Sequence, residues 1–456
     1  MNIKVLFFTV CFLVSNACAQ ESQNVVDALK NAEYVSDISI NSKSDVKLFD
    51  KNVKKFKSVT SLSINGGDIT SFPKSICTLK NLQQLYISGT GIKELPKEIG
   101  KLSSLEIFDI SGSEVESAPD GSITRLPNEI GQLKNLRELK ANYGGLTFIP
   151  SSIAECESLQ ILDLDNNPFI SIPFAIFQLK YLQELGLNCY SLTSLPQDIS
   201  SCKSLNKLRL GGKAYSIPNG ISKLQYLTDL QISYPLSSIP EELFACSKLV
   251  NLDIVLLSYT DIPDSFNSLI NLENLSITGS YNETEKRTRT LPFSISSLKK
   301  LKSLTLSSLG LKEIGTYITS LPNLETLNLS NNEISKISIV QSNIIDLILS
   351  NNKISAFEPS FKNLKKLKTL DLSSNPIKEF HPVILEMDNI ESINLSSTEI
   401  QTISQEILKK LGPITFYLAG TPFGEWLQSE KGQQLYSFYQ AKQINFGTYD
   451  PNMQGD

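Results

Sequence analysis

A short apolar pattern, apolar-x-x-apolar-x-apolar, recurs along almost the whole chain. It begins at Val35, Val59, Leu82, Leu105, Leu136, Leu159, Leu182, Leu205, Leu227, Leu249, Leu272, Leu301, Leu324, Ile344, Leu367 and Ile390, and a degraded copy follows near Pro413. Most starts are 22–24 residues apart, with single steps of 31, 29 and 20 residues. A fixed period of this length is typical of repeat proteins, in which each unit buries its apolar residues only against its neighbours. We therefore expect one array of about seventeen units instead of the three domains that the length alone would suggest.

The first half of each unit predicts a short β-strand. In the unit that begins at Leu159, Leu162 and Leu164 face one way, whereas Asp163 and Asp165 face the other. This alternation with a period of two residues is the signature of a strand with one buried face.

The second half of each unit predicts a turn that leaves the sheet. A proline stands nine residues before ten consecutive strand motifs, at Pro73, Pro96, Pro127, Pro150, Pro173, Pro196, Pro218, Pro240, Pro263 and Pro292. Proline lacks an amide donor and therefore cannot continue a sheet. The apolar residues after Pro127, Ile130 and Leu133, are three positions apart, which suits a helical turn on the outer side. Stacked units of this kind would align their strands in one parallel sheet.

The complete unit from Leu126 to Leu139 resembles the 23-residue leucine-rich repeat of the Ras-suppressor, scribble and plant disease-resistance proteins. The resemblance covers about residues 35–422. It implies an α/β fold, a right-handed horseshoe-shaped solenoid of about seventeen repeats with a parallel β-sheet on its concave face. It also implies that a protein or peptide ligand binds this concave face.

One feature of the repeats departs from the family pattern. The asparagine expected at the turn after the strand stands only at Asn167, Asn332, Asn352 and Asn375, and Gly, Thr, Ser, Tyr or Leu replaces it elsewhere. We therefore expect a patchy ladder of internal hydrogen bonds, with looser turns in the first half of the chain.

Four segments are predicted. Residues 1–19 resemble a signal peptide, with Lys4, an apolar run from Val5 to Val14 and an Ala-Cys-Ala ending. An N-terminal cap with the first degenerate repeat follows at 20–57, then the repeats at 58–422 and a C-terminal cap at 423–456. In this last segment Trp426, Leu427, Leu435, Phe438 and Tyr439 have helical spacing.

The leader predicts export to the periplasm, the cell surface or the medium. An alternative is lipid attachment at Cys18, which would make the protein a tethered adhesin for cell contact. No apolar run approaches the ~20 residues that a transmembrane helix needs.

Composition then narrows the function. The chain has 42 basic and 47 acidic residues and no long basic run, which argues against nucleic acid as a partner. It has a single histidine, His381, in a turn where its most direct role is structural, and no phosphate-binding or CxxC motif. We therefore expect a non-enzymatic binding protein without cofactor or metal, acting as a monomer.

Five cysteines remain after the leader. Cys156, Cys202 and Cys246 replace a core leucine, and they lie two repeats apart, about 10 Å at ~4.8 Å per strand. This distance is too long for a disulfide. We expect these thiols to be reduced and buried, with Cys77 and Cys189 on other faces of their repeats.

The outward positions of the strands form the predicted binding face. From Tyr86 to Asp253 they carry an aromatic residue and charges of both signs, which are typical of interface anchors. The candidate contact residues are Tyr86, Asp109, Glu138, Lys140, Asp163, Asp165, Glu184, Lys207, Arg209 and Asp253. An ordinary solvated strand face is the structural alternative. A glycan is the other ligand class that such a face would accept.

Two rival chemistries concern Asp163 and Asp165. A carboxylate pair would hydrolyse a glycoside only in a walled pocket that separates the two pKa values, which an open sheet does not provide. Calcium binding at residues 163–167 lacks the glycine and the distal glutamate of a calcium loop.

Two insertions, in Ser111–Arg125 and Gly279–Thr290, fall between strand and proline. They should therefore emerge on the same rim of the array, either at its binding side or as tolerated surface loops.

Overall fold

The computed structural model describes residues 23–112, 123–195, 197–213, 217–234, 236, 239–256, 261–279, 289–340, 342–440 and 442–447. They belong to two compact units, here called the N-terminal unit (within 23–236) and the C-terminal unit (within 239–447). The predicted leader with Cys18, most of both insertions and the last nine residues lie outside the described residues.

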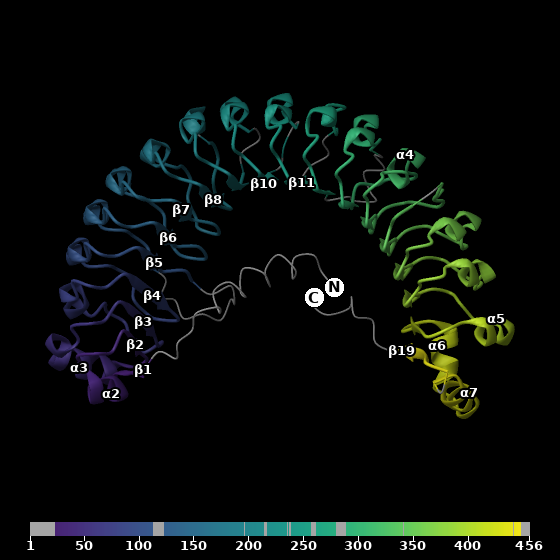
Figure 1. Ribbon diagram of the computed structural model, residues 1–456, viewed down its shortest axis with the longest axis horizontal. Coiled ribbons are helices and arrows are strands. Elements are labelled where there is room, and N and C mark those ends of the chain that lie inside the picture. Colours follow the sequence, from purple (N-terminus) through teal and green to yellow (C-terminus); the bar gives the residue numbers. More distant parts are fainter. Residues whose placement is uncertain are drawn as a thin grey trace. The chain divides into compact units, whose positions relative to one another are not determined.

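The N-terminal unit is built on parallel strands in chain order. They are β1 (Gln23–Asn24), β2 (Asp37–Ile40), β3 (Ser61–Asn65), β4 (Gln84–Ser88), β5 (Ile107–Asp109), β6 (Glu138–Lys140), β7 (Ile161–Asp163), β8 (Glu184–Asn188), β9 (Lys207–Gly211) and β10 (Asp229–Tyr234). Each strand pairs in parallel with the next. Within the unit the strands line the inner side and the short helical turns line the outer side (Figure 1).

The C-terminal unit repeats this arrangement. Its strands are β11 (Asn251–Leu256), β12 (Asn274–Gly279), β13 (Ser303–Ser307), β14 (Thr326–Asn328), β15 (Asp346–Ile348), β16 (Thr369–Asp371), β17 (Ser392–Asn394), β18 (Ile414–Tyr417) and β19 (Ile444–Gly447). All neighbours in this series pair in parallel. Strands β2 to β18 correspond one to one to the seventeen predicted repeats, which confirms the solenoid.

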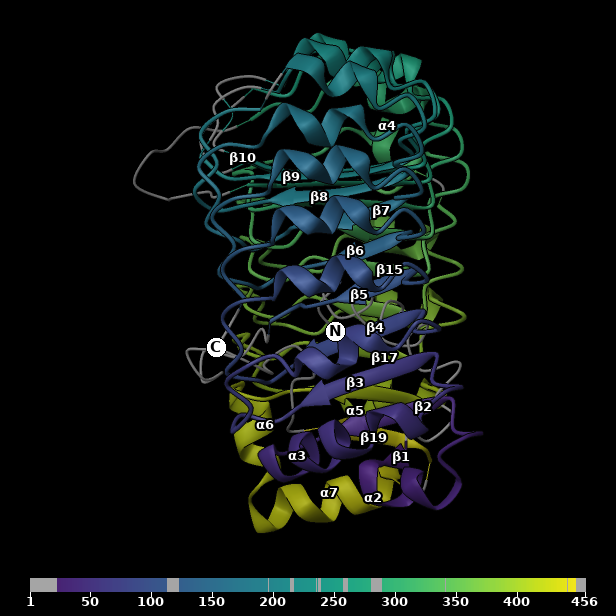
Figure 2. The ribbon, with the colours of Figure 1, turned by 90° about the vertical axis from the view of Figure 1, so that its left-hand side faces the viewer.

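The outer turns are mostly five-residue 3₁₀ helices. They span Lys74–Thr78, Lys97–Lys101, Asn128–Gln132, Ser151–Glu155, Phe174–Gln178, Gln197–Ser201, Asn219–Lys223, Glu241–Ala245, Phe293–Ser297, Pro359–Asn363 and Pro382–Glu386, with shorter ones at Leu29–Asn31, Val53–Lys55 and Phe266–Ser268. Pro127 shows why they form. Its extended backbone ends the preceding segment, and the turn then closes when the N–H of Leu133 donates to the carbonyl of Ile130 at 3.1 Å. Figure 2 shows these turns stacked along the outer side of the N-terminal unit.

Regular α-helices occur mainly near the two ends of the chain. They are α2 (Val25–Ala28), α3 (Lys43–Asn52), α4 (Thr316–Thr319), α5 (Gln405–Lys410), α6 (Pro422–Leu427) and α7 (Glu430–Gln440). Helices α6 and α7 fall in the segment where helical spacing was predicted. The sequence prediction missed β1 and β19, because both lack the apolar motif of the repeats. No helix in the described ranges is long and apolar enough to cross a membrane.

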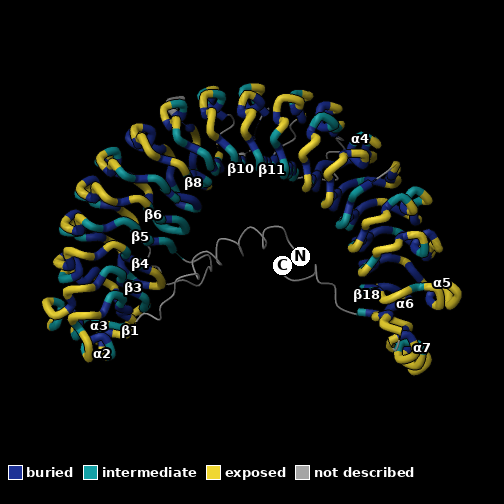
Figure 3. The backbone as a smooth tube through the Cα atoms, in the orientation of Figure 1, coloured by how far each residue is buried: buried dark blue, intermediate teal, exposed yellow. Residues whose placement is uncertain are grey.

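The core of each unit consists of apolar side chains from the strands and the outer turns. Figure 3 shows the buried segments in every repeat. Leu162 and Leu164 are fully buried, as the alternation predicted, and the same holds for Ile130 and Leu133 of the outer turn. Since every repeat contributes such residues, neighbouring repeats stabilise one another through burial of apolar surface.

Buried asparagines cross-link neighbouring repeats at the four predicted positions. The Nδ2 of Asn167 donates to the carbonyl of Ala141 at 2.7 Å, and its Oδ1 accepts from the N–H of Leu146 at 2.9 Å. The side chains of Asn332, Asn352 and Asn375 likewise each donate to a backbone carbonyl and accept from a backbone N–H of the preceding repeat. At other turns smaller groups take part: the thiol of Cys189 donates to the carbonyl of Leu164, and the hydroxyls of Thr398 and Thr421 donate within their own turns.

All five cysteines of the described residues are free and buried, which confirms the prediction for Cys156, Cys202 and Cys246. Burial raises the pKa of Cys156, Cys189 and Cys202 to about 12. It also raises the pKa of Cys77 and Cys246 to about 11. The folded thiols should therefore resist alkylation at neutral pH, because the thiolate is the reactive form.

We expect the stability of the protein to fall above pH 9. Unfolded thiols ionise above that pH, whereas the folded thiols stay protonated, so the unfolded state is favoured until the pH reaches the folded pKa. The variant Cys156→Ala lacks one such group. Its unfolding free energy should therefore drop by about 1.4 kcal/mol less than that of the wild type between pH 8 and pH 10. Urea titrations at the two pH values measure this difference, and identical drops would contradict the assignment.

Candidate binding surface

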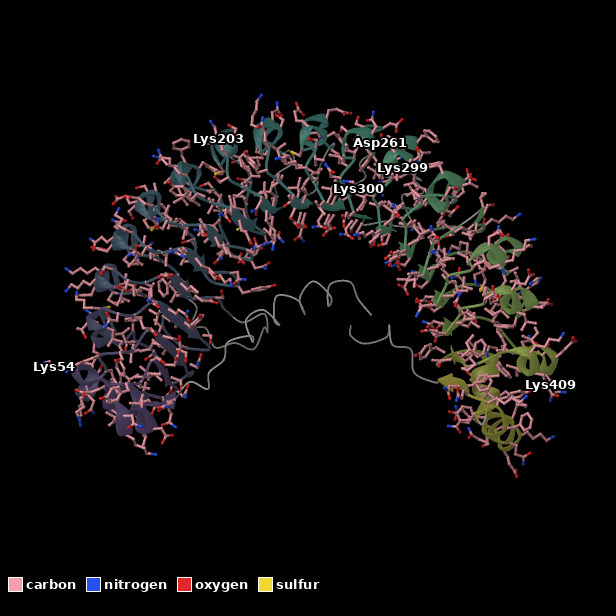
Figure 4. The ribbon with its side chains drawn as sticks, in the orientation of Figure 1. Lys54, Lys203, Asp261, Lys299, Lys300 and Lys409 are labelled. Atoms are coloured by element: carbon pink, nitrogen blue, oxygen red, sulfur yellow. The ribbon has the colours of Figure 1, made fainter. Side chains whose placement is uncertain are left out.

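Each strand of the N-terminal unit has one central residue whose side chain points away from the core, on the inner side of the unit. The strand register places these residues in a single row. From β4 to β10 this row consists of Tyr86, Asp109, Lys140, Asp163, Gly186, Arg209 and Gln231. The apolar residue that precedes each of them is buried. The predicted order of the row is therefore correct. Figure 4 shows side chains projecting from the inner side of this unit, whereas Lys54 and Lys203 lie along its outer side.

A second row runs beside the first, two residues earlier in each strand. It contains Glu138, Glu184, Lys207 and Asp229, with Ile161 between the two glutamates. The structure thus brings all candidate contact residues except Asp253 onto one surface of the N-terminal unit, here called the inner face.

The centre of the inner face is a cluster in which Arg209 of β9 reaches across β8 to two carboxylates. Its Nη2 lies 2.9 Å from Asp163 Oδ2, and its Nε donates to Asp165 Oδ2. The backbone N–H of Asn188 donates to the other oxygen of Asp165 at 2.8 Å. The side chains of Arg209, Asp163 and Asp165 are only 19%, 14% and 11% exposed.

Gly186 of β8 makes this cluster possible. A Cβ atom on Gly186 would lie 2.4 Å from Arg209 Nη2, 2.6 Å from Asp163 Oδ1 and 2.7 Å from Asp165 Oδ1. All three distances are shorter than real contacts of a Cβ atom. A larger residue at position 186 would therefore require the Arg209 guanidinium or the two carboxylates to shift.

Burial governs the charge states in the cluster. Burial raises the pKa of Asp165, and the neighbouring Asp163 carboxylate raises it further, while Arg209 opposes both. Burial alone would lower the pKa of Arg209, but the two carboxylates raise it well above its ordinary value. Arg209 therefore stays charged and is held by the protein itself. Sequence analysis gave it as an exposed anchor, because nothing in the sequence links two repeats that are not neighbours.

Two further ion pairs lie on the inner face, and their lysines, Lys140 and Lys207, are 42% and 35% exposed. Lys140 Nζ is 2.5 Å from Glu138 Oε1, and Lys207 Nζ is 3.5 Å from Glu184 Oε2. Burial would lower the pKa of Lys140, but Glu138, followed by Asp109 and Asp163, raises it. These partly exposed pairs can exchange partners with a ligand at little cost, since such pairs contribute ~0–1 kcal/mol.

Tyr86 is the aromatic residue of the inner face. Its side chain is half-buried, and its hydroxyl donates to Gln84 Oε1 at 3.2 Å. Burial raises the pKa of Tyr86, and the carboxylates of Glu138 and Asp109 raise it further. Asp109 is oriented by the N–H of Ser111, which donates to its Oδ1 at 2.9 Å. Tyr86 therefore offers a neutral phenol ring beside two carboxylates.

The last candidate, Asp253, lies on β11 of the C-terminal unit. In the register of that unit it is followed by Ser276, Thr305 and Asn328. Thr305 is already buried by its neighbours. From Ser276 to Asn328 this row thus presents small polar groups, which provide little area for a partner. It then continues with Ile348, Asp371, Asn394 and Tyr417.

Two chemistries considered from the sequence, metal binding and a carboxylate pair, concern the region of Asp163 and Asp165. Within them, no group of three or more His, Cys, Asp and Glu side chains could hold a metal ion. Asp163 and Asp165 are both bound to the guanidinium of Arg209. His381 caps the turn Pro382–Glu386, because its Nδ1 accepts from the N–H of Val383 at 3.1 Å.

Comparison with known families decides the identity of the fold. The model of the leucine-rich repeat region matches residues 15–145, 71–167 and 158–340, and a model of two leucine-rich repeats matches residues 342–385. The chain belongs to the leucine-rich repeat family. The family assignment agrees with the repeat length, the parallel strands and the outer 3₁₀ turns.

Individual leucine-rich repeat proteins are similar to this chain at low identity. A leucine-rich repeat protein of Leptospira interrogans has a TM-score of 0.65 at 24% identity, over 93% of this chain and 100% of that one. Toll of Drosophila, solved in complex with Spätzle, has a TM-score of 0.57 at 17% identity, over 92% of this chain and 62% of that one. These two likenesses concern the fold alone.

One curated relative is more similar over a short stretch. Protein NUD1 of Saccharomyces cerevisiae is 34% identical over 100 residues, which are 20% of this chain. The match spans only 12% of the length of that yeast protein. The likeness is therefore confined to a few repeats.

Proposed function

We propose that the protein is a non-enzymatic binding scaffold whose inner face in the N-terminal unit holds a protein or peptide ligand. The observation that carries this proposal is the contrast between the two units. The row of the N-terminal unit combines Tyr86 with charges of both signs, whereas the corresponding row of the C-terminal unit is small and polar from Ser276 to Asn328 and carries Asp371 and Tyr417 only further along. The complex of Toll with Spätzle is an example of a protein ligand on a related fold.

The accessible anchors are Tyr86, Lys140, Glu184 and Lys207, and Glu138 is bound to Lys140 beside them. Aromatic and charged side chains dominate binding energy when a partner covers them, because they bury a large area and make directed contacts. The cluster of Arg209, Asp163 and Asp165 lies among these anchors. Its ion pairs and hydrogen bonds hold it in place in the absence of a ligand. Binding should therefore involve little rearrangement of this surface.

Replacing Tyr86 by alanine should weaken ligand binding by roughly 1–4 kcal/mol, because the ligand loses its aromatic contact. Replacing Lys207 by alanine should add to this loss. The ligand is first captured by cross-linking and mass spectrometry in an extract of the source cells. Its affinity for each purified variant is then measured by isothermal titration calorimetry.

The matched control is Asn328→Ala, at the same row position in the C-terminal unit. It should leave the affinity unchanged. If the captured ligand binds the Tyr86→Ala, Lys207→Ala double variant as tightly as it binds the wild type, the binding site lies elsewhere on the protein.

We further propose that this binding takes place outside the cytoplasm, in the periplasm, at the cell surface or in the medium. The support is the signal-like sequence of residues 1–19. Intact mass spectrometry of the protein from its source should give a mature chain that begins at Gln20. A heavier, membrane-extracted chain beginning at Cys18 would favour the alternative, a lipid-tethered adhesin.

A further inference from the structure

The N-terminal cap carries a positive charge that contrasts with the rest of the chain. Residues 43–57, which cover α3 and the 3₁₀ turn Val53–Lys55, contain six lysines and two aspartates but no arginine or histidine. Their net charge is therefore +4, whereas the whole chain carries −5. The remaining residues thus have a net charge of −9.

Four of these lysines lie on one side of the helix and its following turn. Their spacing of four, four and three residues places them on one helical face, opposite the fully buried Phe49. All four are exposed, and together they form the surface here called the basic face: Lys43, Lys47, Lys51 and Lys54. Figure 4 shows Lys54 on the outer side of the N-terminal unit.

The two aspartates of the segment are bound by groups other than these lysines. Asp45 accepts from the N–H of Asn41 at 3.0 Å, and Asp50 accepts from the hydroxyl of Ser75 in the outer turn of the next repeat. Among the described residues, none of the four lysines of the basic face lies within ion-pair distance of a carboxylate. Their charges therefore stay available to an external anion.

Lysines elsewhere in the chain show the opposite arrangement. In the C-terminal unit, Lys365 Nζ lies 3.5 Å from Asp388 Oδ2, and Lys368 Nζ lies 2.8 Å from Glu391 Oε1. Each of these lysines is thus paired with a carboxylate of the next repeat. Like charges four residues apart on a helix are slightly destabilising. A bound anionic partner would offset this cost at the basic face.

We propose that the basic face binds the surface of a membrane that contains anionic lipids. A group of about four to eight lysines on an amphipathic helix is typical of a site for anionic headgroups, because each ammonium near such a surface is attracted to it. This attraction acts over about one Debye length, ~8 Å at physiological salt, so the more distant acidic residues of the chain do not cancel it. The proposal is independent of the ligand on the inner face.

The composition of the basic face favours a lipid surface over an acidic protein or a nucleic acid. Protein interfaces are depleted in lysine and enriched in arginine and aromatic residues, and nucleic-acid sites use arginine forks and stacked aromatic rings. The two aromatic residues of the segment, Phe49 and Phe56, are buried. Ammonium groups on flexible stems suit a bilayer, which offers many phosphates without a fixed geometry.

Vesicle co-sedimentation of the chain from Gln20, which lacks Cys18 and therefore any lipid attached there, tests this proposal. The wild type should bind vesicles that contain phosphatidylglycerol and not vesicles of phosphatidylcholine alone. Raising the salt from about 0.1 M to about 1 M should release it, because the Debye length then falls to about 3 Å. The triple variant Lys47→Gln, Lys51→Gln, Lys54→Gln should bind roughly a hundredfold more weakly, since each lysine contributes about fivefold.

The matched control replaces Lys180, Lys203 and Lys223 by glutamine. These exposed lysines come from three successive repeats of the same unit, so the control has the same net charge as the triple variant of the basic face. It should bind like the wild type, and both variants should keep the melting temperature of the wild type.

Four outcomes would overturn the proposal. They are a wild type that ignores both kinds of vesicle, a triple variant of the basic face that binds normally, a control that loses as much affinity, and displacement from the vesicles by a decaglutamate peptide at matched ionic strength. The last result would indicate an acidic protein as the partner. The ligand site on the inner face is tested separately by calorimetry.

Discussion

Replacing Arg209 by alanine should lower the free energy of unfolding by about 3–5 kcal/mol. The substitution removes the only positive group among the cluster residues that binds Asp163 and Asp165, whose side chains are only 14% and 11% exposed. Two neighbouring carboxylates would then be left without a counter-charge in a poorly hydrated place, and removal of one partner of a buried pair is strongly destabilising for this reason. Urea titration with tryptophan fluorescence or circular dichroism measures the loss.

The loss should depend on pH in a defined direction. Burial already raises the pKa of Asp165 in the wild type, and the loss of Arg209 would raise it further. A carboxyl whose folded pKa exceeds its unfolded value favours the folded state at low pH, and this advantage is lost as the pH rises through the folded pKa. The deficit of Arg209→Ala should therefore be largest near neutral pH and shrink toward pH 4.

The matched control is Lys207→Ala, which removes a charge from the same strand. Its ion pair with Glu184 is about one third exposed, so the change should cost only ~0–1 kcal/mol. Adding Asp163→Asn and Asp165→Asn to Arg209→Ala should recover most of the lost stability, because no unpaired charge remains. An Arg209→Ala variant as stable as Lys207→Ala would show that the cluster is not the structural element described here.

Much of this arrangement could be predicted because two periods coexist in the sequence. The 23-residue period fixes which residues of successive repeats are neighbours, and the two-residue period fixes which of them face inward. Tyr86, Asp109 and Lys140 could thus be ordered in one row from the sequence, and the register of β4 to β6 agrees.

The sequence does not show which side chains of that row are bound by other residues of the protein and which remain accessible. Sequence analysis treated Arg209 and Tyr86 as equal anchors, but Arg209 is held by carboxylates of another repeat, whereas Tyr86 keeps an accessible ring. The only signal was Gly186, since a strand residue without a side chain implies that something lies over it. Glycine alone does not say which group that is.

The end of the chain shows a different limit. The spacing of Leu427 and Tyr439 predicted a helical cap, and both are buried on α6 and α7. Strand β19 escaped prediction because Ile444 and Phe446 give only two alternating apolar residues, which fit many conformations. Its identity depends on pairing with β18, a contact that no local pattern encodes.

Replacing Asn332 by alanine should destabilise the protein by about 3–6 kcal/mol. The Nδ2 of Asn332 donates to the carbonyls of Leu306, Leu329 and Ser330, and its Oδ1 accepts from the N–H groups of Leu309 and Leu311. Alanine leaves these groups buried without a partner, and each unsatisfied buried group costs about 1–3 kcal/mol. Some of them will regain a bond by local shifts or by admitting water, so the expected total is below the full sum.

The comparison that isolates this effect is Asn343→Ala. Asn343 is partly exposed, and its side chain donates a hydrogen bond to the carbonyl of Pro322. Its loss should cost about 1 kcal/mol or less, because water can replace the bond. Asn332→Ser should fall between the two, since a hydroxyl can satisfy one carbonyl within its own turn, as Thr398 does. If Asn332→Ala unfolds at the same urea concentration as Asn343→Ala, the buried ladder contributes little. In that case the stability of the C-terminal unit would have to come almost entirely from its stacked leucines.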